Sequence, residues 1–273
     1  MNSVYDYYQR RSSRWGYRLL LNGVRHFGYY PNGEYTKHRQ AQYLMMQKVA
    51  KKLDLQPGAK VLDVGCGEGS TSLYFAQKYG YKMSGIDLLD ESIVRARKKI
   101  CKDKDPGIRF DIGSYMKLPY KTGTFDGVFA LESLYHAQDL DKAVSELKRV
   151  LKPGGKLVIA DYTVTKNSNK ASLLIQHGAH ASAGRGLVQS PHGSYQKRLR
   201  NAGFENVAYV DLTKNVMPMA VWFYRIAYLP ALLMPWARQS SNHIHLSTAY
   251  NLWSFAEQGF WKYVMLSATK SIY

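Results

Sequence analysis

An apolar run that leads straight into three alternately placed glycines constrains this chain more than any other feature. Residues 60–64 have the pattern of a short buried strand, and Gly65, Gly67 and Gly69 follow at once. Glycines at this spacing let the backbone turn sharply and let a ligand approach without meeting a Cβ atom. In an open parallel sheet, ligands bind beyond the carboxyl ends of the strands. The sequence therefore predicts a ligand site at the end of this strand.

Strand patterns alternate with helix patterns along the chain. Helices are predicted at residues 37–55, 71–79, 90–100 and 140–151, and further strands at 82–86, 108–112, 125–131, 156–161, 206–212 and 261–269. This rhythm is typical of parallel strands joined by crossover helices. We therefore expect an α/β fold with a doubly wound, mostly parallel sheet that is covered on both faces.

At 273 residues the chain is long enough for one large domain with insertions. We expect an N-terminal helical cap over residues 1–55 and a single domain over residues 56–273. Two stretches interrupt the alternation, one polar (residues 163–194) and one aromatic-rich (residues 213–258). Insertions of this length usually form lids or substrate pockets.

The glycine spacing also bears on the kind of ligand. A dinucleotide site would have G-x-G-x-x-G, with a pyrophosphate on the helix N-terminus. Here the third glycine comes one residue early, and Glu68 is expected to repel a pyrophosphate. A bulky, cationic cofactor suits the loop better. Asp87 ends the second strand, where its carboxylate can accept hydrogen bonds from both hydroxyls of a ribose.

Several segments resemble the signatures of one enzyme family. Residues 61–69 (Val-Leu-Asp-Val-Gly-Cys-Gly-Glu-Gly) resemble the first signature of class I S-adenosylmethionine-dependent methyltransferases. Residues 118–120, 124–126 and 149–155 resemble the later signatures, in the same order. The resemblance implies a Rossmann-like seven-stranded sheet, S-adenosyl-L-methionine as the cofactor, and a methyltransferase activity.

The resemblance also implies roles for individual residues. Asp63, Gly65 and Gly67 would line the methionine part of the cofactor, Asp87 would bind the ribose, and Leu88 would pack on the adenine. The family often has an acidic residue where Ser114 stands, so that a hydroxyl or backbone group would contact the adenine here. The expected cofactor-binding residues are Asp63, Gly65, Cys66, Gly67, Asp87, Leu88, Ser114, Tyr115 and Leu131.

Three segments favour a subfamily. Residues 115–120 and 130–137 are similar to segments of sterol and tocopherol methyltransferases, and residues 25–30 are similar to the short aromatic segment those enzymes carry before the cofactor domain. This resemblance implies a hydrophobic small-molecule acceptor, with methylation at a carbon of a prenyl, terpenoid or sterol-like chain. Methylation at oxygen or nitrogen of a phenolic, alkaloid or amine product is the alternative.

The residues after the fourth strand are candidates for catalysis. An alkene acceptor passes through a carbocation, which aromatic faces stabilise by about 0.5–2 kcal/mol per contact, and a base then removes a proton. If residues 131–137 are helical, Glu132 and His136 share one face at i, i+4 spacing, as a base and its orienting partner. Alternatively, Glu132 bonds the cofactor's amino group and His136 caps a helix or satisfies a loop.

The aromatic segment before the cofactor domain supplies further candidates. His26 and Tyr29, with Tyr30, are expected to close over the cofactor, although packing against a helix is an equal alternative. The histidine pairs His177/His180 and His243/His245 lack a third ligand, so that no metal is expected.

The formal charge of +18 favours a phosphate-bearing partner, which could be nucleic acid, anionic lipid or a diphosphate substrate. A basic surface without one partner is the alternative, because lysines and arginines are spread along the chain. A nucleic-acid methyltransferase is disfavoured, because the sequence carries no added RNA-binding module and no motif that holds a flipped base. The two cysteines, Cys66 and Cys101, favour a reducing compartment, and a cytoplasmic protein is expected.

The most apolar stretch, residues 216–236, contains Arg225 and is expected to be interrupted by Pro218, Pro230 and Pro235, which argues against a simple membrane-spanning helix. Its tyrosines and tryptophans favour a substrate lid, a membrane-surface helix or a homo-oligomer interface over a dry core. In the second case the protein is peripheral to a membrane. A non-catalytic module at a membrane surface is the rival to an enzyme.

Overall fold

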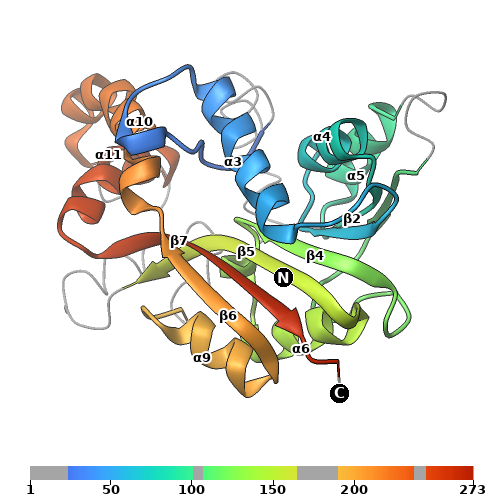
Figure 1. Cartoon of the computed structure of the whole chain (residues 1–273). Coiled ribbons are helices and arrows are strands. Elements are labelled where there is room, and N and C mark those ends of the chain that lie inside the picture. Colours follow the sequence, from blue (N-terminus) through green and yellow to red (C-terminus); the bar gives the residue numbers. More distant parts are fainter. Residues whose placement is uncertain (1–23, 101–106, 165–189, 237–243, 273) are drawn as a thin grey trace.

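A computed structural model describes residues 24–100, 107–164, 190–236 and 244–272 (Figure 1). Seven strands form one sheet in the order β3-β2-β1-β4-β5-β7-β6. The parallel strands are β3 (Arg109–Ile112), β2 (Lys82–Asp87), β1 (Lys60–Val64), β4 (Phe125–Leu131) and β5 (Leu151–Val164). Strand β7 (Trp261–Lys270) runs antiparallel to β5 and to β6 (Phe204–Asp211). The predicted doubly wound, mostly parallel seven-stranded sheet is confirmed.

Helices cover both faces of this sheet (Figure 1). Helices α3 (His38–Leu53), α4 (Ser70–Tyr79) and α5 (Asp90–Lys98) lie on one side, and α6 (Leu140–Val150) and α9 (Ser194–Asn201) lie on the other. Neighbouring residues of β1 face opposite ways, so that Val61 packs with α3 and Leu62 packs with α6. Both faces of the strand are therefore apolar, which explains its continuous apolar pattern.

The strand order places the site. Strand β1 is followed along the chain by β2 on one side, and β4 then returns to pair with β1 on its other side. The connections therefore diverge between β1 and β4, and a crevice opens beyond the carboxyl ends of these two strands. The glycine loop follows β1 directly, so that it lies at this crevice.

The aromatic-rich insertion forms two helices, α10 (Thr213–Leu233) and α11 (Ile244–Glu257), which pack on each other. The expectation that prolines interrupt this stretch is wrong, because α10 continues through Pro218 and Pro230. Buried contacts of Val216, Met219 and Ala220 hold its first half against the sheet and offset the lost hydrogen bonds. Within the described part of the chain, α10 alone is long and apolar enough to cross a membrane, by length and composition only.

Candidate functional site

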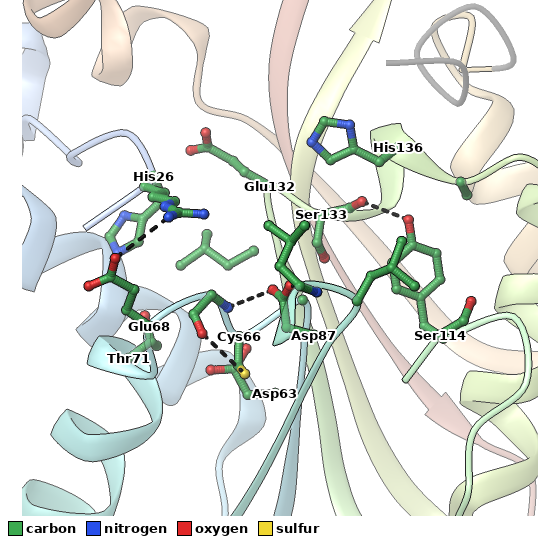
Figure 2. Close-up of a pocket in the computed structure, with 18 of the residues that line it drawn as sticks. His26, Asp63, Cys66, Glu68, Thr71, Asp87, Ser114, Glu132, Ser133 and His136 are labelled. Carbon is green, nitrogen blue, oxygen red and sulfur yellow. Dashed lines mark hydrogen bonds and ion pairs between the residues drawn. The ribbon is translucent and has the colours of Figure 1, made fainter. Parts of the chain in front are cut away.

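A pocket opens at the carboxyl ends of β1, β2 and β4 (Figure 2). Its walls come from the glycine loop, the end of β2, the segment after β3, the segment after β4, and residues 24–26 of the N-terminal segment. Every residue predicted to bind the cofactor lines this pocket, namely Asp63, Gly65, Cys66, Gly67, Asp87, Leu88, Ser114, Tyr115 and Leu131. Three of the predicted catalytic residues, Glu132, His136 and His26, line it as well.

Close packing fixes the glycine loop. Gly65 has a φ of 78°, and a Cβ atom placed there would lie 2.4 Å from the Cβ of Ser133. The Ser133 hydroxyl in turn donates to the carbonyl of Val64 at 2.6 Å. The backbone N–H groups of Gly65 and Cys66 both donate to the carbonyl of Ile86, at 2.8 and 3.0 Å. The loop is therefore tied to β2 and to the segment after β4, and only glycine fits at position 65.

The carboxylate of Asp87 is held by the glycine loop and by its own turn. Its Oδ2 accepts from the backbone N–H of Gly67 at 2.8 Å, and its Oδ1 accepts from that of Leu89 at 2.9 Å. Burial raises the pKa of Asp87, while these hydrogen bonds and the charge of Arg25 oppose the rise. The backbone of Leu88 contributes a further hydrogen bond, and because a carboxylate has about four lone-pair sites, the group can still accept a hydrogen bond from a ligand.

Asp87→Asn should weaken cofactor binding by about 100-fold, which corresponds to about 3 kcal/mol. The oxygen of the asparagine amide can accept from one of the two backbone N–H groups, of Gly67 or Leu89. Its NH₂ group then faces the other N–H, which is also a donor, and the side chain offers fewer acceptors to a ribose. Isothermal titration with S-adenosylmethionine measures the loss. Asp90→Asn is the matched control, because Asp90 is an exposed residue at the start of α5. Equal affinities for both variants would contradict a ribose contact by Asp87.

Asp63 lies deeper, at the floor of the pocket in Figure 2. It is 3% exposed, and its Oδ2 accepts from the hydroxyl of Ser72 at 2.6 Å. Burial raises its pKa to about 7, and the nearby charge of Asp87 adds to the rise. A cationic group in the pocket would favour the ionised form. The two acids therefore make the pocket suited to a ligand that carries positive charge.

Glu68 has a different role from the one expected. Its carboxylate lies 2.9 Å from Nε of Arg95, 3.3 Å from Nζ of Lys99 and 3.6 Å from a guanidinium nitrogen of Arg25. These charges hold its pKa below the ordinary value although burial opposes them. The expectation that Glu68 repels a pyrophosphate is wrong, because the cations neutralise it. It instead ties Arg25, and with it the N-terminal segment, to the glycine loop.

At the other side of the pocket, Ser114 and Tyr115 are engaged by the chain itself. The Ser114 hydroxyl accepts from the backbone N–H of Met116 at 3.2 Å. The Tyr115 hydroxyl donates to the carbonyl of Ser133 at 3.1 Å. Ser114 can still donate its own proton to a ligand. This wall therefore offers a hydroxyl at the position where the family often has an acidic residue.

The segment after β4 is not the expected helix. Glu132 has a φ of 53°, in the left-handed region, and only Leu134–His136 form a short 3-10 helix, η2. The buried carboxylate of Asp161, at 2.9 Å, accepts the backbone N–H of Tyr135 and so holds η2 against β5. The prediction that Glu132 and His136 share one helix face is therefore wrong. A left-handed glutamate is strained, and such strain is typical of functional sites.

Three donors converge on the Glu132 carboxylate. Its Oε1 accepts from the backbone N–H of Phe27 at 2.6 Å and from the Tyr263 hydroxyl at 2.8 Å. Its Oε2 accepts from the Tyr162 hydroxyl at 2.7 Å. Burial raises its pKa to about 7, and the three hydrogen bonds limit the rise. A carboxylate has about four lone-pair sites, so that one, on Oε2, remains for a ligand proton.

His26 is a neutral imidazole. Its Nδ1 lies 2.9 Å from the carbonyl oxygen of Phe27, which can only accept, so that Nδ1 carries the proton. Its Nε2 therefore holds a lone pair, and this buried atom has no hydrogen-bond partner among the described residues. Burial lowers its pKa to about 4. His136 is also buried, and its ring lies 3.8 Å from that of Tyr135, centre to centre.

The structure does not bring Tyr29 to the pocket, as far as the described residues define it. Its N–H donates to the carbonyl of Ala41 at 2.8 Å, and Nζ of Lys48 lies 4.1 Å from the centre of its ring. Tyr30 is fully buried, and its hydroxyl bonds the ring of His38. Both tyrosines therefore fix the N-terminal segment on α3.

Sequence reasoning missed five residues that hold the site together. Ser72, Tyr162 and Tyr263 donate to the predicted acids. Ser133 bonds the end of β1, and Asp161 holds η2. Tyr162 on β5 and Tyr263 on β7 are register partners across an antiparallel pair. Their separation along the chain hides this pairing, and only the order of the strands reveals it. The sequence held one indication for Ser133, because this residue directly follows Glu132 after the fourth strand. Its contact with Gly65 became visible only in the structure.

The described residues contain no group of three or more side chains that could hold a metal ion. His177, His180 and His243 lie outside the described residues, as does Cys101, and the side chain of His245 is not described. Cys66 is a buried free thiol of the glycine loop.

Comparison with known proteins adds to this geometry. Residues 62–159 match the model of a family described as a methyltransferase domain. The S-adenosyl-L-methionine-dependent Diels-Alderase iccD of Talaromyces variabilis is 30% identical over 245 residues, which cover 85% of this chain and 83% of that protein.

Two solved structures share the fold. The structure of the (4+2)-cyclase SpnF matches with a TM-score of 0.76 at 23% identity, and the match covers 100% of this chain and 95% of the other. Geranyl diphosphate C-methyltransferase from Streptomyces coelicolor A3(2) matches with a TM-score of 0.72 at 18% identity, over 98% of this chain and 96% of the other.

Proposed function

Because this chain belongs to the S-adenosylmethionine-dependent methyltransferase family, we propose that it methylates a hydrophobic small molecule, at a carbon of a prenyl, terpenoid or sterol-like chain. One observation carries the choice of acceptor. The half-buried Glu132, with its strained backbone, lies in the pocket wall, and its carboxylate accepts hydrogen bonds from two tyrosines of an aromatic cluster. A base in aromatic surroundings is what carbon methylation of an alkene requires.

The residues of the pocket fit the cofactor. The backbone at Gly65 packs so closely on Ser133 that a Cβ there would clash. Because position 65 has no side chain, a nucleoside can approach the backbone of the loop directly. Asp87 would hold the ribose through its remaining lone pair. Asp63 and Gly67 would face the amino-acid part, and Leu88 and Ser114 the adenine. The acids of the floor favour a cofactor that carries a sulfonium and an ammonium group.

The rings around Glu132 form a continuous aromatic cluster. Phe27, Tyr162 and Tyr263 lie 5.4–6.1 Å apart, ring centre to ring centre, and Trp261 lies 5.7 Å from Tyr162. These four rings lie behind Glu132, outside the residues that line the pocket, so that they exclude water from its carboxylate and leave an apolar setting for a developing cation. A relative by fold carries the name geranyl diphosphate C-methyltransferase, which supports a prenyl chain as the acceptor.

The proposed chemistry needs few groups. When bound, S-adenosylmethionine supplies an electrophilic methyl group on a sulfonium. Asp87 and the glycine loop orient it, and residues 24–26 close the pocket from the N-terminal side. Glu132 accepts the proton that the methylated carbon skeleton must lose, through the open lone pair of Oε2. His26 and His136 line the pocket on opposite sides of Glu132 in Figure 2, and they orient the acceptor.

An acceptor screen tests this function. The purified chain is incubated with S-adenosylmethionine and, separately, a prenyl diphosphate, a sterol, a phenol and an amine. Mass spectrometry should show one added methyl group on the prenyl or sterol carbon skeleton, together with S-adenosylhomocysteine. If only the phenol or the amine is methylated, the acceptor atom is oxygen or nitrogen, and carbon methylation is excluded. The Asp87→Asn variant controls for turnover that is independent of this site.

A second reaction is favoured by a specific observation. A relative over most of this chain is named a Diels-Alderase, and a structure that covers all of it is named a (4+2)-cyclase. Such a ring closure forms two carbon–carbon bonds within one substrate and consumes no methyl group. In the same screen it would give a product of unchanged mass without S-adenosylhomocysteine. A polyene substrate that behaves so would overturn methyl transfer as the reaction.

A further inference from the structure

The second half of α10 carries an exposed apolar face. Six large side chains form it, namely Ile226, Tyr228, Leu229, Leu232, Leu233 and Trp236, the last just beyond the helix. Their spacing of three and four residues places them on one side of the helix. Leu229 is 65% exposed, Leu233 is 77% exposed and Trp236 is 66% exposed. We refer to these six residues as the α10 face.

The other sides of α10 are covered. Val216, Met219 and Ala220 are buried in the core that the helix shares with the sheet. Tyr224 packs against Tyr250 and Trp253 of α11, at 5.3 and 4.9 Å between ring centres. The helix is therefore anchored along its first half and along α11. The two helices lie at one end of the molecule (Figure 1), and the side chains of the α10 face are exposed there.

The charged residues of the segment that carries this face are of one sign. Residues 213–256 contain Lys214, Arg225 and Arg238 and no aspartate or glutamate, within a chain of formal charge +18. Arg225 is exposed directly before Ile226. An apolar face with tyrosine and tryptophan beside arginine matches the boundary between lipid tails and anionic headgroups.

From these observations we propose that the α10 face docks the protein on the surface of an anionic membrane. Leu229, Leu232 and Leu233 enter the boundary between headgroups and acyl chains, Tyr228 and Trp236 lie at headgroup level, and Arg225 contacts lipid phosphates. The helix lies on the membrane and does not cross it, because its first half is buried against the sheet. A second copy on this face would bring like charges together without an acid from this segment to pair them.

The proposal does not depend on the acceptor or on the reaction. It places the protein peripherally at a membrane, where apolar small molecules also concentrate. Because the α10 face is exposed, its residues can be changed without disturbing the core.

Vesicle flotation of the full chain tests the proposal. The vesicles consist of phosphatidylcholine alone or of phosphatidylcholine mixed with phosphatidylserine. The chain should bind the mixed vesicles at least about tenfold more tightly, and added salt should weaken this binding. Leu233→Glu should weaken it by a further factor of about ten or more. Ile272→Glu, at a position 70% exposed, is the matched control for added charge and should bind like the unchanged chain.

A second pair of variants tests the charge. Arg225→Gln should weaken binding to the mixed vesicles only, whereas Lys52→Gln, an exposed change on α3, should have a smaller effect. Equal binding by the Leu233→Glu and Ile272→Glu variants, or no binding to either vesicle, would overturn the proposal. Light scattering, which measures the mass of the protein in solution, tests whether a second copy of the chain occupies the α10 face instead. A dimer of the 31.1 kDa chain that Leu233→Glu dissociates, without vesicle binding, would assign the face to a second copy and overturn the membrane.

Discussion

Gly65→Ala should reduce S-adenosylmethionine affinity by at least about 100-fold, which corresponds to about 3 kcal/mol. Two effects combine at this position. A φ of 78° is costly for alanine, and the new Cβ would lie 2.4 Å from the Cβ of Ser133. The loop must move away from Ser133, and its N–H contacts to Ile86 and Asp87 move with it. Isothermal titration calorimetry measures the loss of affinity, and circular dichroism shows whether the fold persists.

Two variants separate the clash from the backbone strain. Gly58→Ala also places alanine at a positive φ, of 87°, but its Cβ would meet nothing within 4 Å among the described residues. We expect it to lower stability by about 1 kcal/mol and to leave cofactor affinity unchanged. In the double variant Gly65→Ala with Ser133→Gly, the clashing side chain is gone, and part of the affinity should return. An unaltered affinity for Gly65→Ala alone would show that the loop does not cradle the cofactor.

The residues predicted from the glycine loop and from β2 gather in one pocket because their positions are set locally. Gly65 directly follows β1 and Asp87 ends β2, and parallel strands bring their carboxyl ends to one edge. A glycine pattern after an apolar run therefore predicts both the fold and the position of the ligand. The same logic predicted that Glu132, at the end of β4, faces this edge, and it lines the pocket.

The acceptor half of the site depends on contacts between distant segments. Tyr263 lies 131 positions after Glu132, and Phe27 lies 105 positions before it, yet both donate to the same oxygen. No periodic pattern indicates such contacts. The helix expected after β4 failed for the same reason, because the distant carboxylate of Asp161 sets the local backbone. The ion pairs of Glu68 with Arg95 and Lys99 likewise required the packing of α5 on the loop.

The predicted interruption of residues 216–236 by prolines was wrong because the helix propensity of proline takes no account of distant packing contacts. Pro218 and Pro230 each remove one backbone hydrogen bond, which favours interruption when the helix is considered alone. Burial of Val216, Met219 and Ala220 outweighs this loss in the folded chain. The same burial explains why the apolar residues divide into a packed half and an exposed half.

Glu132→Gln should lower the rate of methyl transfer by about 100- to 10,000-fold and leave cofactor affinity within a few-fold. The amide keeps an oxygen for the N–H of Phe27 but cannot take up a proton. In the unchanged enzyme, kcat/KM should rise with pH through about 7, because the base must be ionised and burial raises its pKa to that value. This rise should be absent from the residual activity of the Glu132→Gln variant.

The stability of the folded chain should fall with rising pH, whereas kcat/KM should rise. The pKa of Glu132 is about 7 in the folded chain and near 4.5 in the unfolded chain, so that between these values the folded state binds the extra proton. Stability from this residue is therefore present at low pH and is lost as pH rises through about 7. Relative to Glu132→Gln, the free energy of unfolding of the unchanged protein should fall by up to about 3 kcal/mol across this window.

Tyr263→Phe distinguishes a base from a structural carboxylate. It removes one of the hydrogen bonds that lower the pKa of Glu132, so that this pKa must rise and the ascending limb of kcat/KM must move to higher pH. Tyr209→Phe, on the exposed side of β6, is the control and should leave the limb in place. If Glu132 only anchors Phe27, then Tyr263→Phe changes the melting temperature while the pH of the limb stays constant. A constant limb would therefore exclude Glu132 as the group that accepts the proton.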